Sequence, residues 1–322
     1  MNASKEIGMK RQLSLLLMAC VLALPAAAAE WPTKPVTMIV PFPPGGSTDV
    51  LARMLAQNLS QKLGQQVVVE NRAGAAGNLG TSLVVKATPD GHTLSMSTSG
   101  PLANAKFLYK NLPYDPLTDL TPVAAIGEIP MGIAVSASSK LGSIKDLIDA
   151  ARAQPGKLSI AHPGTGTIGH LTAELIKAQS NVTAISVPHK GDIAAMTDLM
   201  GGVVDVISIP ITALIPQIKA GKIRALAVTS RQRLDSLPQV PTAQEQGINE
   251  AATVWMAVVG PKGLPDSVVS RLNRDINAFI ATPEARSKLS EYGAVPLGGS
   301  AQQLADFMVS DSAKWKRIIE GA

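Results

Sequence analysis

Three glycine-rich segments constrain the fold of this chain more than any other feature. They cover residues 41–48, 73–80 and 162–169, and each follows an apolar run and precedes a helical pattern. Such a sequence predicts a strand, a tight loop and a helix. Repetition of that unit is typical of a sheet whose faces are covered by helices. We therefore predict an α/β fold.

The first unit shows the pattern most clearly. Residues 36–40 are an apolar run, and leucine recurs at every fourth position from Leu51 to Leu63, before Gly64. This spacing predicts a strand and then a helix over 49–63.

Residues 231–250, rich in polar residues and proline, are interpreted as a connector. The same reasoning predicts strands at 67–70, 93–97, 158–161, 184–187, 203–207, 223–228 and 254–259, and helices at 78–87, 168–178, 267–280, 283–291 and 301–320, with further helices between the strands of 184–228.

The N-terminus has the three parts of a secretory signal. Lys5, Lys10 and Arg11 precede an apolar run over 13–24, and small residues follow. A basic segment, an apolar run of about a dozen residues and a small-residue cleavage site define such a signal. The run is shorter than the roughly 20 apolar residues of a membrane span. We expect residues 1–29 to be removed after Ala29 and the protein to be periplasmic.

Composition excludes several other classes of protein. Cys20 is the only cysteine among 322 residues, so a disulfide framework or a thiolate metal cluster within the chain is excluded. Residues 17–20 loosely resemble a lipoprotein box, but the later alanine site favours cleavage over lipidation. Loss of the signal lowers the formal net charge from +5 to +3, and basic residues do not cluster with aromatics, which disfavours nucleic-acid binding. Four scattered histidines leave little material for a metal site.

The glycine-rich loops are candidate anion-binding sites. Glycine lets backbone N–H groups approach a ligand closely. The first N–H groups of each following helix have no partner within the helix, and each helix start favours an anion by roughly 0.3–1 kcal/mol. Several such loops in one cleft would hold a carboxylate without arginine. The alternative is that each loop is only a tight turn between a strand and a helix.

The third loop also has the spacing of a dinucleotide-binding motif. Gly164, Gly166 and Gly169 match G-x-G-x-x-G. That motif requires an acidic residue about 20 positions further on. This chain has His189 and Lys190 in that region, and the nearest acid is Asp192. We therefore expect no nicotinamide or other cofactor.

An exported enzyme is an alternative class. The chain has no G-x-S-x-G, H-E-x-x-H or P-loop motif. His170, on the first turn of a predicted helix, would donate to an anionic ligand or orient Thr167. His189 and Lys190 follow a strand, where α/β sheets place ligands, or they form a solvated loop tip. Asp49 either stabilises the start of the first helix or receives a ligand ammonium group.

An ordered set of motifs extends over essentially the whole chain after the signal. It comprises Trp31-Pro32-x-Lys34-Pro35-Val36, the loop Pro41–Asp49 with Arg53, Val69-Glu70-Asn71-Arg72-x-Gly74-Ala75-x-Gly77-Asn78, Ala87-x-Pro89-Asp90-Gly91-x-Thr93, Leu112-Pro113-Tyr114-Asp115-Pro116, Gly164-Thr165-Gly166 with His170, Lys190-Gly191, Asp198-Leu199-x-Gly201-Gly202-x-x-Asp205, 220–230 and Leu237-Pro238-x-Val240-Pro241-Thr242. This set resembles the Bug-type extracytoplasmic solute receptors, which are the substrate-binding components of tripartite tricarboxylate transporters.

The resemblance implies a two-lobed periplasmic-binding-protein fold of the Venus-flytrap type II class, each lobe a mixed sheet flanked by helices. Residues 30–127 and 252–322 would form lobe one, and 128–251 lobe two. Backbone N–H groups, hydroxyls and bridging waters would hold the carboxylate of the ligand. This sequence departs from the family in His189, where tyrosine is common, and in Ala76, where a second glycine is frequent. The implied ligand-binding residues are Phe42, Gly45, Gly46, Ser47, Asp49, Ala75, Ala76, Gly77, Asn78, Ser97, Thr98, Ser99, Gly164, Thr165, Gly166, Thr167, His170, Lys190, Gly191 and Asp192.

The sequence therefore predicts a periplasmic, non-enzymatic, monomeric receptor for a small organic acid. The acid is a dicarboxylate, a tricarboxylate, an amino acid or an aromatic acid, and the receptor delivers it to the membrane subunits of a transporter. Two alternatives stay open. One is an exported enzyme that uses His170 and the glycine-rich loop, and the other is a binding protein that serves a sensor kinase. Trp255, on a late predicted strand, is a candidate reporter of lobe closure.

Overall fold

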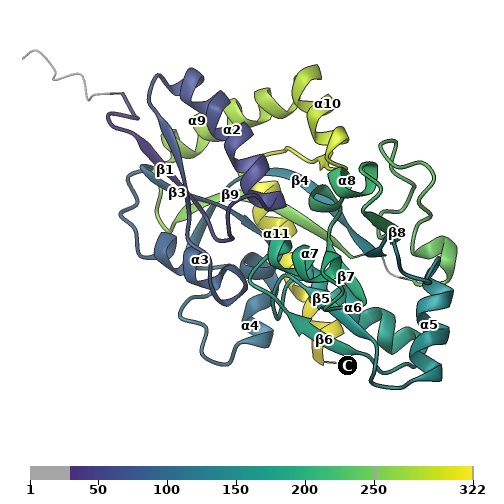
Figure 1. The fold of residues 1–322 in the computed structure, drawn as a ribbon. Helices are drawn as coiled ribbons and strands as arrows, with labels where there is room; N and C mark the ends of the chain where they lie inside the picture. The colour runs from purple at the N-terminus through teal and green to yellow at the C-terminus, as the bar shows by residue number, and fades with distance from the viewer. Residues whose placement is uncertain (1–29, 250–251, 321–322) are drawn as a thin grey trace, which may run out of the picture. The chain divides into compact units, whose positions relative to one another are not determined.

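The computed structural model describes residues 30–249 and 252–320 (Figure 1). The predicted signal peptide, residues 1–29, lies outside the described residues. The described residues divide between two units, one that includes 30–33 and one that begins at residue 34. Residues 30–33 of the first unit contain no helix or strand, and the second unit contains all the elements that follow. Among the described residues, no helix combines the length and apolar character that crossing a bilayer requires.

The first half of the sheet begins with a parallel group. Strand β1 (Val36–Val40) lies between β2 (Val67–Asn71) and β3 (Thr93–Thr98) and is parallel to both. Strand β9 (Thr253–Pro261), which comes from late in the sequence, pairs with β3 in the antiparallel direction. It also pairs, antiparallel, with β4 (Leu120–Ser136). The mixed sheet thus joins the beginning and the end of the chain.

Strand β4 connects this group to a second one. Its first part, up to Pro130, pairs with β9, and its last part pairs with β7 (Val206–Pro210) and β8 (Ile223–Val228). Strand β5 (Ser159–His162) lies parallel to β7 and to β6 (Ile185–Pro188). A short β10 (Val295–Pro296) pairs with β4 at Glu128 and Gly127. A single long strand therefore takes part in both groups (Figure 1).

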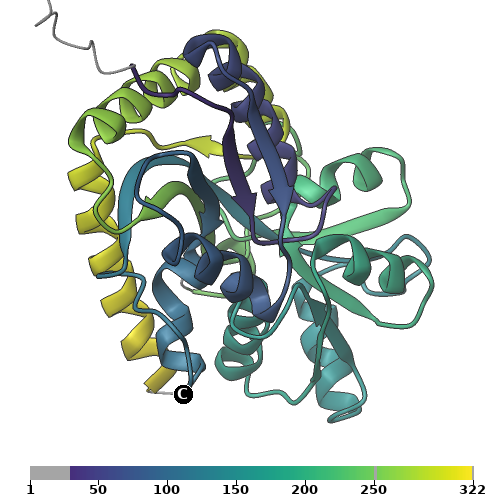
Figure 2. The same cartoon turned by 90° about the vertical axis from the view of Figure 1, so that its left-hand side faces the viewer.

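Helices cover both groups, and α2 shows why they form. Its leucines Leu51, Leu55 and Leu59 are buried, and Gly64 ends the helix with a left-handed backbone, φ 67°. Helix α11 packs against β4 (Figure 2). The helices are α2 (Ser47–Leu63), α3 (Asn78–Val85), α4 (Ala105–Leu108), α5 (Ile144–Ala153), α6 (Ile168–Ser180), α7 (Asp192–Met200), α8 (Ile211–Lys219), α9 (Asp266–Ile280), α10 (Pro283–Glu291) and α11 (Ala301–Glu320), with single turns η1 (Ala75–Gly77), η2 (Gly100–Asn104) and η3 (Gln244–Gln246).

The α/β prediction is confirmed, and most predicted elements lie within a few residues of the observed ones. Three differences matter. Strand β4, which joins the two groups, was not predicted, nor were α4 and α5. The strand predicted at 203–207 begins only at Val206, because residues 201–205 form a turn with Gly202 at φ 71°. The predicted lobe boundaries, with lobe one at 30–127 and 252–322 and lobe two at 128–251, remain predictions.

Candidate functional site

The first glycine-rich loop is held in place by Asp49. Its carboxylate accepts a hydrogen bond from the Gly45 amide at 2.9 Å and another from the Asn71 side chain at 2.9 Å. Arg53, one turn further along α2, forms an ion pair with it at 2.9 Å. Burial opposes ionisation, but the hydrogen bonds from Arg53, Gly45 and Asn71 outweigh it, so the pKa of Asp49 is lowered. Asp49 thus stabilises the loop and has no carboxylate lone pair left for a ligand ammonium group.

A carboxylate from the other half of the sequence lies at the start of α2. Asp192, the first residue of α7, accepts hydrogen bonds from the Ser47 amide at 3.1 Å and from the Ser47 hydroxyl at 2.8 Å. A Cβ placed on Gly46 would lie only 3.2 Å from the same carboxylate oxygen, so glycine permits this approach. Desolvation raises the pKa of Asp192, although the hydrogen bonds from Ser47 act in the opposite direction. The first loop therefore already binds a carboxylate group.

A cavity of about 40 Å³ lies beside this contact. Its walls come from the first and third glycine-rich loops, from the start of α7 and from strands β4 and β9, and Asp192 is the only charged residue among them. The lining residues are Phe42, Pro43, Gly46, Ser47, Thr48, Thr98, Met131, Pro163, Thr167, Ile168, Gly169, Asp192, Ile193, Pro210, Val254 and Met256.

The third glycine-rich loop is bonded to Tyr109 and lies close to the second glycine-rich loop. Thr167 caps α6, because its hydroxyl accepts from the His170 amide at 3.4 Å and donates to the Gly164 carbonyl at 2.8 Å. Tyr109 follows α4 in the sequence, and its hydroxyl donates to the Thr165 carbonyl at 2.6 Å. A Cβ on Gly164 would lie 3.3 Å from the Cβ of Ala76 in the second loop. All three loops therefore lie close together, but only the first and third line the cavity.

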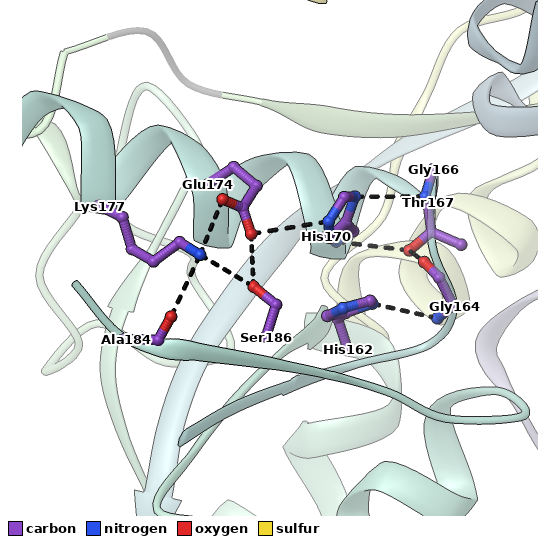
Figure 3. A network of polar contacts seen from close by, with 9 residues as sticks. All are labelled: His162, Gly164, Gly166, Thr167, His170, Glu174, Lys177, Ala184 and Ser186. Atoms are coloured by element: carbon purple, nitrogen blue, oxygen red, sulfur yellow. Dashed lines mark hydrogen bonds and ion pairs between the residues drawn. The ribbon is translucent and has the colours of Figure 1, made fainter. Parts of the chain in front are cut away.

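Two histidines accept hydrogen bonds from backbone amides of the third loop (Figure 3). The Gly164 amide donates to Nδ1 of His162, and the Gly166 amide donates to Nδ1 of His170, both at 3.3 Å. The two rings lie 4.6 Å apart. Burial, and then the charge of His170, lower the pKa of His162 to about 4. Burial also lowers the pKa of His170. Both rings are therefore neutral acceptors near pH 7.

The network continues along α6. Nε2 of His170 lies 3.6 Å from the carboxylate of Glu174, which pairs with Lys177 at 2.8 Å and accepts from the Ser186 hydroxyl (Figure 3). Lys177 also donates to Ser186 at 3.0 Å. Both ring nitrogens of His170 are thus engaged, Nδ1 with the loop amide of Gly166 and Nε2 with Glu174. It does not line the cavity, and this arrangement gives it a structural role rather than that of a catalytic base.

The second glycine-rich loop and the end of β3 supply buried polar groups. Ala75 and Ala76 both have left-handed backbones, φ 46° and 53°. The Ser97 hydroxyl lies 3.3 Å from that of Thr81. Within the described part of the chain, the buried Ser99 hydroxyl and Asn78 Nδ2 have no hydrogen-bond partner.

The segment before α7 is shaped by contacts to the first loop. A Cβ on Gly191, whose φ is 100°, would lie 2.9 Å from Pro43, so only glycine fits there without strain. His189 bonds to Asp198 at 2.8 Å and to the Val187 carbonyl at 3.1 Å. Lys190 is exposed and is not among the cavity residues.

The structure separates the implied ligand-binding residues into two sets. Phe42, Gly46, Ser47, Thr98, Thr167 and Asp192 line the cavity. The others surround it or support its loops: Gly45, Asp49, Ala75, Ala76, Gly77, Asn78, Ser97, Ser99, Gly164, Thr165, Gly166, His170, Lys190 and Gly191. Sequence reasoning missed the strand residues Met131, Pro210, Val254 and Met256. Only the predicted strand around 254–259 gave a signal for two of them, since Val254 and Met256 share one face of it.

The arrangement defines a class of protein. Two groups of α/β elements share the long strand β4 and present glycine-rich loops to one cavity, as in the two-lobed periplasmic solute-binding proteins. The model of the tripartite tricarboxylate transporter family receptor matches residues 51–322, and the chain belongs to this family. It is a solute-binding receptor and not an enzyme.

Individual relatives agree with this assignment. BugT of Bordetella pertussis is 39% identical over 302 residues, which are 92% of this chain and 92% of that protein. The structure of Rpa4515 of R. palustris with adipate has a TM-score of 0.88 and 38% identity, and covers 91% of this chain and 99% of that one. The structure of MatC from Rhodopseudomonas palustris with bound malate has a TM-score of 0.85 and 29% identity, and covers 90% of this chain and 100% of that one.

Proposed function

We propose that this receptor captures a small organic acid in the cavity beside Ser47 and delivers it to the membrane subunits of a tripartite transporter. One observation carries the proposal: the amide and hydroxyl of Ser47 already hold a carboxylate, that of Asp192. No Lys or Arg lines the cavity, so neutral donors would bind the acid. The relatives that bind adipate and malate support the same class of ligand.

In the proposed complex, the ligand carboxylate takes the position of the Asp192 carboxylate. The cavity of about 40 Å³ is too small for a dicarboxylate while the loops are in contact, so entry requires them to separate. Strand β4, which takes part in both groups, and β9, which pairs with its first part, are the proposed hinge. Once Asp192 is displaced, the hydroxyl of Ser99 and the amide of Asn78 are further buried donors for the acid.

Delivery requires that the ligand favour one arrangement of the lobes. A ligand stabilises the closed receptor only by the difference between its affinities for the closed and open forms. The proposed transporter would recognise the closed surface. A monomeric state and removal of residues 1–29 on export belong to this proposal, and delivery to a sensor kinase is the alternative for the partner.

Calorimetric titration with adipate and with malate tests the proposal, with their dimethyl esters as neutral controls. We expect saturable binding of an acid, no binding of its ester, and recovery of the acid unchanged. Ser47→Ala removes one hydrogen bond to a charged group and should weaken binding by about tenfold or more. Ser267→Ala, an exposed serine near the start of α9, is the matched control. Equal affinity for acid and ester, or chemical conversion of the acid, would contradict the proposal.

A further inference from the structure

A second, larger cavity lies on the other face of the strands that join the two sheet groups. Its volume is about 650 Å³, within the range of roughly 300–1,000 Å³ that is typical of small-molecule sites. Along β9, Val254 and Met256 line the first cavity, whereas Thr253 and Trp255 line the second. Successive residues of a strand point to opposite faces, so β9 separates the two cavities. The carboxylate site therefore does not include this space.

Aromatic side chains form one wall of the second cavity. Trp255 of β9 packs against Phe307 of α11 with ring centroids 5.3 Å apart, and Trp315 lies two turns further along α11. Only 3% of the chain is aromatic, so three aromatic residues in one cavity are a marked concentration. The Trp255 indole N–H donates to the Asp311 carboxylate at 2.8 Å, which fixes both side chains.

Two carboxylates lie beside these rings. Asp311 belongs to α11 and Glu128 to β4, where it is paired with Trp255 of β9 in the strand register. In the part of the chain that the structure describes, neither forms an ion pair, and Glu128 accepts only from the Thr253 hydroxyl at 3.3 Å. Burial, and more weakly the charge of Glu128, raise the pKa of Asp311, while hydrogen bonds from Trp255 and Trp315 and the charge of Lys314 act in the opposite direction. The cavity lining also includes a third acid, Asp235, and three bases, Arg231, Arg233 and Lys314.

The basic residues around the cavity are engaged or exposed. Lys314 lies 5.4 Å from the ring centroid of Trp315. Arg233 forms two hydrogen bonds with Glu245. Arg231 and Asp235 are exposed. The half-buried acids Glu128 and Asp311 therefore lie with the aromatic rings, whereas Arg231 and Arg233 are exposed and Lys314 is half-buried.

We propose that this cavity is a second small-molecule site and that it binds an organic cation, an ammonium group on an apolar stem. The ammonium group donates to Asp311 and Glu128, and the stem packs against Trp255, Phe307 and Trp315. Carboxylates accept short, strong hydrogen bonds from ammonium groups, and aromatic faces attract cations. The proposal is independent of the carboxylate site, because its residues belong to the opposite face of β4 and β9.

Benzylamine is the probe, with benzyl alcohol and phenylacetate as its neutral and anionic counterparts. We expect benzylamine to bind the purified receptor saturably at one site, with a change in tryptophan fluorescence, and to bind at least about tenfold more tightly than either counterpart. Saturation of the first cavity with adipate should leave this binding in place. Absence of saturable binding up to about 10 mM, equal binding of benzyl alcohol, or competition with adipate overturns the proposal.

Asp311→Asn tests the assignment of the residue. Asparagine keeps an oxygen that accepts from Trp255 but removes the charge, and it should weaken benzylamine binding by about tenfold. Asp306→Asn, an exposed position on the same helix, is the matched control and should change the affinity less than twofold. Glu128→Gln gives an independent measurement should Asp311→Asn fail to fold. Unchanged affinity in a folded Asp311→Asn or Glu128→Gln variant contradicts the proposal.

Discussion

The Asp192 carboxylate accepts two hydrogen bonds from Ser47, a residue 145 positions away in the sequence, and this contact joins the first glycine-rich loop to the start of α7. A ligand carboxylate that uses the same donors must displace Asp192. While Asp192 is ionised, the two negative charges also repel each other in a poorly solvated site. Displacing Asp192 therefore costs free energy, and this cost lowers the affinity for the acid.

Asp192→Asn should raise the affinity for adipate or malate by about tenfold, because asparagine carries no charge and is a weaker competitor for Ser47. Calorimetry at pH 7 measures the change. Asp266→Asn is the matched control, since Asp266 is also the first residue of a helix but is exposed and is not among the cavity residues. Weaker binding by Asp192→Asn would show that Asp192 helps to hold the ligand.

The affinity for the acid should also depend on pH through Asp192. Its pKa in the folded protein is raised above 3.8 by desolvation. As the pH falls from 7 towards that raised pKa, Asp192 gains a proton and its repulsion of the ligand is lost. Binding of an acid that stays ionised should therefore strengthen as the pH falls, and the Asp192→Asn variant should lack this dependence. A parallel pH profile for the two proteins would contradict the prediction.

The stability of the fold should fall in mild acid because of His162. This side chain is 1% exposed, and its pKa is lowered to about 4 from the usual 6.5. The unfolded chain thus binds a proton between these values and the folded chain does not, so stability is complete above pH 6.5 and is lost as the pH falls towards 4. The full loss is on the order of 3 kcal/mol. Urea unfolding at several pH values measures it.

His162→Asn serves as the comparison in that experiment. The asparagine oxygen takes the place of Nδ1 as the acceptor for the Gly164 amide, but it does not titrate. The free energy of unfolding of this variant should depend less on pH between 4 and 6.5, whatever its value at pH 7. The same slope in both proteins would mean that His162 is not the group responsible.

Local sequence patterns predicted α2 well because the leucine spacing and Gly64 act within one element. Strand β4 was missed for a physical reason. It takes part in both sheet groups and is buried on both faces over most of its length, so its sequence lacks the alternation that marks a half-exposed strand. Its sequence also contains Pro122 and Pro130, and proline inside a run of residues argues against a strand.

The candidate site was predictable only where its features are local in the sequence, as in α2. Glycine-rich loops and the Thr167 cap are local features, and the sequence showed them. The contact between Ser47 and Asp192 and the contact between the rings of His162 and His170 depend on tertiary packing. Trp255, the candidate reporter of lobe closure, lines the second cavity, and its role as a reporter stays a prediction.

The left-handed backbone of Ala76 should make glycine favourable at this position. A non-glycine residue at φ 53° costs roughly 1–2 kcal/mol, and glycine removes that strain at an entropic cost of about 0.4–1 kcal/mol in the unfolded chain. Ala76→Gly should therefore leave the free energy of unfolding unchanged or raise it by about 1 kcal/mol. Ala278→Gly, at an exposed position inside α9, should lower it by about 1 kcal/mol. Similar destabilisation by both changes would contradict the argument.

Tyr109 should contribute to closure, because its hydroxyl donates to the Thr165 carbonyl at 2.6 Å and so joins α4 to the third glycine-rich loop. Tyr109→Phe removes this hydrogen bond, worth about 0.5–1.5 kcal/mol, and keeps the ring. We expect the affinity for the acid to fall by about 3- to 10-fold, mainly through faster dissociation, in stopped-flow measurements. In Tyr292→Phe, the hydroxyl that is removed has no hydrogen bond among the described residues, so affinity should be unchanged. Equal effects of the two changes, or a slower association alone, would rule out the role of Tyr109 in holding the loops together.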